Sequence, residues 1–342
     1  MTDTKFGCLP TAIGTMPHTN SLAACSLVAR HLKDIPVWPQ LPSRSYLENM
    51  CAQYSEGFPG VVVEEARTYV DTSLDLTRPL DELYTAYLEN DTNKYGISHN
   101  FATGIRTLLS LENLSPLAIK GQVTGPVTWG LTVTDENRKS IIYHDIFGDM
   151  VPKLLRLKAS WQEKALSQIS KNTIIFVDEP YMAAFGSISI MLSNERIISL
   201  LEEVFGGISG LKGVHCCGNT DWSILLRTSA DILSFDTYNY AQSLSLYPKE
   251  IKEFLNRQGA IAWGIVPNEA KLLAKETVAS LKDRLFEAMV PFTRNGVPFK
   301  QLLEQGLLTP NCGLARLPNE EATAQVLELL TELSKMIKRR YS

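Results

Sequence analysis

This sequence of 342 residues lacks an excess of basic residues, long apolar runs and a secretory signal. Lysine and arginine total 33 against 37 aspartates and glutamates, and the formal net charge of -4 gives no sign of nucleic-acid binding. No apolar run reaches the roughly 18 to 20 residues that span a bilayer, and the N-terminus lacks the basic and apolar stretches of a secretory signal. We therefore expect a cytoplasmic protein with neither nucleic acid nor membrane as a partner.

Cysteine is also scarce. Six cysteines in a chain of this length are too few for a disulfide framework. In a reducing compartment, a close group of histidine and cysteine is better explained by metal binding or catalysis. One such group is present, because His215, Cys216 and Cys217 are consecutive.

Short β-rich runs alternate with longer segments of helical periodicity, a pattern typical of a parallel sheet with crossover helices. Apolar residues recur at helical spacing in 150–171, 188–206 and 319–340. No linker or repeat divides the chain, so we expect an α/β fold: a (β/α)8 TIM barrel in one domain, 1–342, with long insertions after the first two strands. The eight predicted strands are 8–15, 58–65, 115–123, 172–180, 210–217, 231–237, 259–266 and 306–312.

Polar residues follow these apolar runs at the carboxyl ends of the strands, where barrel enzymes carry their chemistry. Alternate residues of a strand share a face, so His215 and Cys217 can reach one metal ion while Cys216 points away. Cys312, at the end of the last strand, is the candidate third ligand, and zinc prefers such ligands. From spacing alone, packing of small apolar cysteines and a satisfied core histidine explains the group as well as metal binding does.

Two acidic pairs also lie at strand ends. Asp178 follows the apolar run TIIFV, which favours a central strand that delivers a carboxylate to the barrel mouth. The alternative is that Asp178-Glu179-Pro180 caps a following helix. Glu64 and Glu65 could equally be a solvated strand end.

Seven motifs together resemble the C-terminal catalytic barrel of cobalamin-independent methionine synthase, in a superfamily that includes uroporphyrinogen decarboxylase. They follow the family's order, and His-x-Cys, the TGPVT turn and Asn-Cys-Gly are the most specific. The motifs are IGTMPHT (13–19), VEEAR (63–67), KGQVTGPVTW (120–129), FVDEP (176–180), VHCCG (214–218), SFDT (234–237) and TPNCGL (309–314).

This resemblance implies a zinc-dependent methyltransferase that converts homocysteine to methionine. It implies that zinc is held by His215, Cys217 and Cys312; Asp236 matches a further ligand that is a glutamate in the family, and its side chain is shorter. Asp178 and Glu65 match carboxylates that receive the homocysteine amino group, Asp178 being the catalytic candidate. The segment Ile13, Gly14 and Thr15 matches the backbone that binds the substrate carboxylate.

The sequence departs from the two-barrel members of the family in two ways. We expect no N-terminal folate-binding barrel, and Val266 stands where those enzymes carry a histidine that protonates the folate. Both features match short methionine synthases associated with methylated corrinoids, so methylcobalamin or a methylated corrinoid protein is the expected methyl donor. Cob(I)alamin leaves without a proton; if folate were the donor, His18 would be the first acid to test.

Other functions stay open at this point. A related corrinoid methyltransferase could use another thiol such as coenzyme M, although Asp178 and Glu65 disfavour an anionic sulfonate. A uroporphyrinogen decarboxylase-like enzyme needs arginines near the N-terminus, and none precedes Ile13. A structural zinc ion would require a closed site with four ligands.

Overall fold

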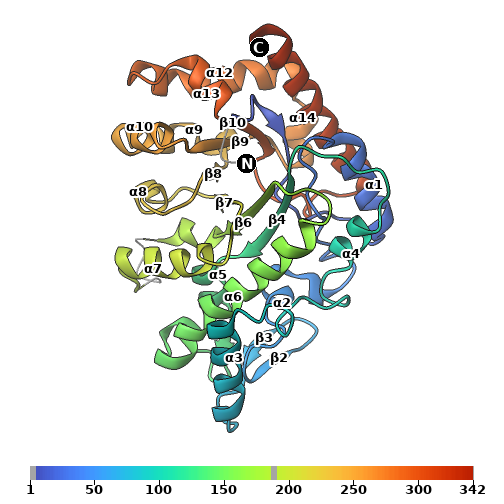
Figure 1. Ribbon diagram of the computed structural model, residues 1–342. Helices are drawn as coiled ribbons and strands as arrows, with labels where there is room; N and C mark the ends of the chain where they lie inside the picture. Colours follow the sequence, from blue (N-terminus) through green and yellow to red (C-terminus); the bar gives the residue numbers. More distant parts are fainter. Residues whose placement is uncertain (1–4, 186–190, 342) are drawn as a thin grey trace.

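The computed structural model describes residues 5–185 and 191–341. At its centre is a curled sheet of seven parallel strands in the order β1-β10-β9-β8-β7-β6-β4 (Figure 1). These strands fall within seven of the eight predicted runs or extend one residue beyond them. They are β1 (Leu9–Pro10), β4 (Ile119–Thr124), β6 (Thr173–Asp178), β7 (Leu211–Cys216), β8 (Ile232–Phe235), β9 (Ala260–Val266) and β10 (Gly306–Pro310).

The prediction that 58–65 forms a barrel strand is wrong. Within it, β2 (Val61–Val63) pairs antiparallel with β3 (Thr68–Val70), and β3 pairs with β5 (Thr134–Asp135) in a separate three-stranded sheet. The run VVVEEARTYV is thus a hairpin rather than a strand followed by a loop. It lies below the main sheet in Figure 1, beside α3 (Thr77–Glu89).

Residues 34–40 join the two edges of the seven-stranded sheet, although they form no regular strand. Isolated parallel bridges link Val37 to Lys120 of β4 and Gln40 to Thr15, beyond β1. On the β4 side Lys120 N donates to Pro36 O at 2.9 Å, and on the β1 side Gln40 N donates to Gly14 O at 3.0 Å. An eight-stranded barrel is therefore not confirmed, because the eighth position holds a segment whose prolines lack the N–H groups of a regular ladder.

Helices surround the sheet in Figure 1. The predicted helix 150–171 overlaps α6, and the predicted helix 319–340 corresponds to α14. Of the predicted helix 188–206, residues 188–190 lie outside the described residues, and the remainder contains α7. The other helices and 3-10 turns connect or flank the strands. The bounds are α1 (Ser21–His31), η1 (Tyr46–Glu48), α2 (Met50–Gln53), α4 (Thr103–Leu109), α5 (Pro126–Thr132), η2 (Ile141–Tyr143), α6 (Asp145–Leu166), η3 (Pro180–Ala184), α7 (Asn194–Phe205), α8 (Trp222–Leu226), α9 (Thr237–Leu244), α10 (Pro248–Asn256), α11 (Ala270–Leu273), α12 (Val278–Arg294), α13 (Phe299–Glu304) and α14 (Glu320–Tyr341).

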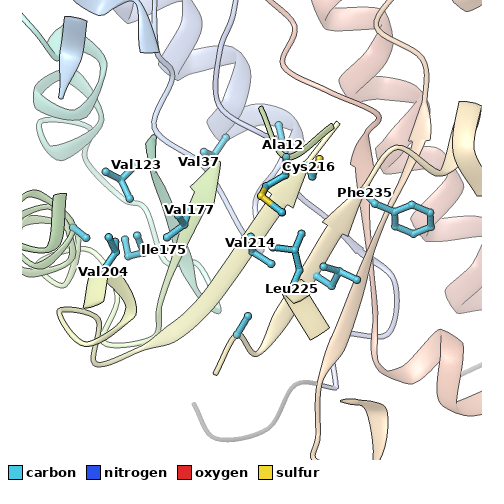
Figure 2. Packing of buried hydrophobic residues seen from close by; sticks show 14 of the residues in the cluster. Ala12, Val37, Val123, Ile175, Val177, Val204, Val214, Cys216, Leu225 and Phe235 are labelled. Atoms are coloured by element: carbon cyan, nitrogen blue, oxygen red, sulfur yellow. The ribbon is translucent and has the colours of Figure 1, made fainter. Parts of the chain in front are cut away.

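Two apolar clusters stabilise this arrangement. The larger lies between the sheet and its helices and includes Val177, Val214 and Cys216 (Figure 2). The smaller includes Leu9, Phe176 and Ile232 and lies on the opposite face of the strands, inside the curl. Gly213 pairs with Phe176 across β7 and β6, and a Cβ at Gly213 would lie 2.1 Å from the phenyl ring, so only glycine fits there. The floor of the curled sheet is therefore packed with side chains.

Strand register places polar side chains above this floor. Asp178 pairs with His215, and His215 pairs with Ser234 on the next strand. These three residues each follow a floor residue of the same strand by two positions, and therefore lie on the same inner face. The floor residues are Phe176, Gly213 and Ile232. No helix among the described residues is both long and apolar enough to cross a bilayer.

Candidate metal and substrate site

The structure brings three soft ligands together at the carboxyl ends of the strands. His215 lies on β7, Cys217 directly follows β7, and Cys312 follows β10. One ligand atom from each residue lies within 4.8 Å of the other two. Residues almost 100 positions apart in the sequence thus lie close together in the fold.

The ring of His215 is oriented for binding through Nε2. Nδ1 lies 2.9 Å from the hydroxyl oxygen of Ser234, which is fully buried. Nε2 is buried and has no hydrogen-bond partner. When the hydroxyl accepts the Nδ1 proton, Nε2 carries the free lone pair that a metal requires.

The two thiols lie close together and shift each other's pKa in opposite directions. The Cys312 thiol beside Cys217 lowers the pKa of Cys217, the hydrogen bond between the two being the largest cause. That same contact raises the pKa of Cys312, because a second thiolate beside the first is disfavoured. A divalent cation bound by both sulfur atoms would stabilise both as thiolates.

Cys216 lies on the other face of β7. It is fully buried in the apolar cluster between sheet and helices (Figure 2), and burial raises its pKa to about 12. Cys8, Cys25 and Cys51 are buried too, with the same pKa shift. These four thiols are packing residues, as the sequence indicated.

The donor set fits zinc. One imidazole nitrogen with a free lone pair and two thiols, one already acidic, are ligands that zinc prefers, and three protein ligands leave a position for substrate. Asp236 does not belong to the group of three. Its Oδ1 accepts from Asn239 N at 2.9 Å, which caps α9, and its Oδ2 accepts from the side chains of Asn239 and Asn311.

Asp178 is a buried carboxylate at the end of β6, and its Oδ1 has no hydrogen-bond partner. Burial raises its pKa to about 6, and the charges of His215 and Lys120 oppose that shift. The alternative role, capping of the following helix, is not found: η3 has no side-chain cap, and Glu179 binds the start of α5, which precedes it in the chain. The Glu179 carboxylate accepts from the backbone N–H of Val127 and of Thr128, at 2.9 and 2.7 Å, and caps α5.

A cavity of about 460 Å³ opens onto these groups, a size suited to an amino acid. Ile13 and Thr15 line it, with Gly14 between them at φ +144°, a backbone conformation that favours glycine. The lining residues are Ile13, Thr15, Gln40, Met50, Asp178, Pro180, His215, Cys217, Asp236, Asn239, Tyr240, Asn268, Glu269, Asn311, Cys312, Gly313, Ala315 and Arg316.

Three residues singled out in the sequence lie elsewhere. Glu65 is exposed in the turn between β2 and β3 and does not line the cavity. His18 is 2% exposed, and its Nε2 lies 3.7 Å from a carboxylate oxygen of Glu320. Val266 is fully buried in the cluster behind the sheet. The hairpin explains the position of Glu65, because its strand is not part of the curled sheet.

Sequence reasoning missed four residues that shape the site. Three of them contact it directly: Gln40 lines the cavity, Ser234 contacts His215, and Asn311 binds Asp236 next to Cys312. Asn311 also accepts from Asn268 N at 2.9 Å. The fourth, Lys120, is fully buried. A single lysine inside the apolar run SPLAIKGQV was a usable signal for it.

Comparison with known proteins gives relatives of one type. No family model matches the chain. A methionine synthase of Methanocaldococcus jannaschii is 26% identical over 236 residues, which cover 66% of this chain and 68% of that protein. A solved B12-independent methionine synthase from Shewanella sp. W3-18-1, in complex with selenomethionine, superposes with a TM-score of 0.62 at 15% identity, over 97% of this chain and 98% of that one.

A methyltransferase from Methanosarcina mazei superposes with a TM-score of 0.53 at 16% identity, over 94% of this chain and 84% of that one. At such identities the solved structures establish the fold, and the sequence relative adds the type of protein. The chain therefore has a methionine synthase-like core domain, a relationship that supports an enzyme of the methyltransferase or methionine synthase type.

Proposed function

We propose that this chain is a zinc-dependent methyltransferase that forms methionine from homocysteine. The observation that supports it most is the convergence of His215, Cys217 and Cys312 on a cavity that also holds the unpartnered carboxylate of Asp178. The three ligands can serve an acceptor thiol, and the carboxylate can bind an ammonium group of the same molecule.

Zinc bound by these residues would lower the pKa of the acceptor thiol, so that it reacts as a thiolate at neutral pH. The chain supplies the placement. Ser234 fixes the His215 ring, and Asn311 holds the loop that carries Cys312. Because Asp236 is used as a helix cap, the group has three protein ligands, which favours a catalytic over a structural site.

The substrate's two charged groups match two sides of the cavity. Its ammonium group would bind Asp178, whose Oδ1 lacks a partner and whose charge costs free energy in its buried position. Its carboxylate would bind the backbone at Ile13 to Thr15. A sulfonate acceptor would lack the ammonium group and would meet Asp178 as a like charge.

A methylated corrinoid is our proposed methyl donor, either methylcobalamin or a corrinoid protein. The thiolate takes the methyl group from cobalt, and the bonding electron pair leaves with cob(I)alamin, so no acid is required. Among the described residues at the end of β9, no histidine lines the cavity. His18, the other candidate acid, lies 3.7 Å from Glu320. The Shewanella protein is described as B12-independent and lends no support to this donor, which is proposed from the chain's own residues.

One assay tests the proposal. Zinc-loaded protein is incubated with homocysteine and either methylcobalamin or methyltetrahydrofolate, and methionine is quantified. We expect methionine with methylcobalamin and none with the folate, since general acid help is commonly worth roughly 10² to 10⁴ in rate. Turnover with the folate alone would refute the donor, and absence of methionine with both donors would refute the function.

A further inference from the structure

Lys120 is a buried lysine inside the curled sheet, and burial lowers the pKa of its amine to about 7. Its side chain is fully buried on β4, above the apolar floor, and Nζ lies 4.2 Å from the ring centroid of Phe176. Nζ donates to the carbonyl oxygen of Ile13 at 2.8 Å. No carboxylate among the described residues lies within 4.0 Å of it. A buried amine with a carbonyl as its closest partner calls for a role beyond packing.

The hydrogen bond from Lys120 Nζ to Ile13 O fixes the orientation of the peptide group between Ile13 and Gly14. In a trans peptide the C=O and the following N–H point in opposite directions. Because Lys120 holds the Ile13 carbonyl, the Gly14 N–H points away from Lys120, and the residues on either side of it, Ile13 and Thr15, line the cavity. Within the described ranges, no acceptor is bonded to the N–H of Gly14 or of Thr15.

A second contact keeps this peptide in place. A Cβ at Gly14 would lie 2.6 Å from the side-chain amide of Gln122, which itself donates to Trp38 O at 3.1 Å. Lys120 and Gln122 are alternate residues of β4 and share its inner face. The segment is thus supported from below by two side chains of one strand.

We propose that Lys120 is a positioning residue for the carboxylate of the amino-acid thiol, acting through the Ile13–Gly14 peptide. The inference rests on the proposed function and deepens it. Lys120 acts through its hydrogen bond to the Ile13 carbonyl, which directs the Gly14 N–H at the carboxylate. It does not line the cavity, so it is not a nucleophile toward substrate.

The test uses Lys120→Met, which keeps the length of the side chain, and three acceptor thiols at pH 8 with methylcobalamin as donor. Homocysteine has both charged groups, 4-mercaptobutanoate has only the carboxylate, and 3-aminopropane-1-thiol has only the amine. We expect KM to rise about tenfold or more for the first two thiols and to stay unchanged for the third, with zinc content unaffected.

Lys158→Met is the matched control. Lys158 is also fully buried, and its Nζ lies 3.4 Å from the carbonyls of Tyr95 and Gly96, away from the cavity. Its loss reports the general effect of removing a buried lysine and should not separate the thiols. If Lys120→Met fails to fold, Gly14→Ala disturbs the same peptide through Gln122 and should give the same carboxylate-selective loss.

The role of Lys120 would be refuted if the wild-type protein methylates homocysteine but Lys120→Met changes KM equally for all three thiols, or for none of them. The proposed function would not be affected by that result. Wild-type protein that uses none of the three thiols would refute the proposed function, and this inference with it.

Discussion

The hydroxyl of Ser234 lies 2.9 Å from Nδ1 of His215 and leaves Nε2 free to face the two thiols. Hydrogen bonds of this kind orient metal-binding histidines, and their loss typically costs 10- to 100-fold in metal affinity. We therefore expect Ser234→Ala to bind zinc about 10- to 100-fold more weakly, as measured by competition with a chelator of known affinity. Wild-type affinity in this variant would show that the hydroxyl does not orient the ring.

Adjacent cysteines should respond differently to substitution. Cys217→Ser and Cys312→Ser should each lose most bound zinc, because a thiolate ligand is removed, whereas Cys216→Ala should keep about one zinc per chain. Metal analysis of the purified proteins measures this. Full zinc content in both serine variants would exclude these residues as ligands.

Asp178→Asn should weaken the use of thiols that carry an amine. The charge-assisted hydrogen bond to an ammonium group is worth about 1.5 to 3 kcal/mol, so KM should rise for homocysteine and for 3-aminopropane-1-thiol but not for 4-mercaptobutanoate. This pattern is the complement of the one expected for Lys120→Met. Equal damage with all three thiols would assign Asp178 a structural role.

Binding of the product methionine should depend on pH through Asp178. Burial raises the pKa of this carboxyl from 3.8 to about 6, so it becomes protonated and neutral as the pH falls through about 6, while the ligand's ammonium group stays charged. Affinity should fall across that range in titration calorimetry, and the Asp178→Asn variant should lose this dependence. For folding the sign is reversed: the raised pKa contributes stability below about pH 4, and this contribution is lost as the pH rises through about 6.

Glu179, next in the chain, should matter for stability instead. Burial raises its pKa to about 7, but its two oxygens accept two backbone N–H groups of α5 and the hydroxyl of Thr128 at 2.6 Å. Glu179→Gln would leave one of these buried donors without an acceptor, so it should lower the free energy of unfolding by about 1 to 3 kcal/mol. Zinc content should not change. Asp178→Asn, which removes a buried and partly unpartnered charge, should unfold at the same or a higher urea concentration. Equal loss of stability in both variants would contradict this division of roles.

Sequence patterns located the strands of the sheet well because each is a short apolar run followed by a polar end. The segment 34–40 was missed because Pro36 and Pro39 signal a loop, and hydrogen bonds to distant residues decide its position. Val61–Val63 was assigned to the wrong sheet, because periodicity cannot tell a strand's partner.

For the candidate site, spacing on β7 separated His215 and Cys217 from Cys216, since alternation along a strand is a local property. Cys312 became a candidate through its position at the end of the last predicted strand, and the resemblance implied the same ligand; its distance from the other two depends on the folded sheet. The support from Ser234 and Lys120 depends on strand register and on contacts between residues as far apart as Ile13 and Lys120, and these exist only in the folded chain.

The pairing of β1 with β10 also constrains the order of folding. Leu9 lies opposite Leu307, so a strand near the start of the chain finds its strand partner almost 300 residues later. During synthesis, β1 and the Ile13–Thr15 segment beyond it are complete long before β10 and Cys312 leave the ribosome. The Ile13–Thr15 segment and Cys312 therefore come together in the same late event, and contacts of such high sequence separation form slowly. A nascent chain therefore cannot bring His215, Cys217 and Cys312 together until β10 has been made and can pair with β1.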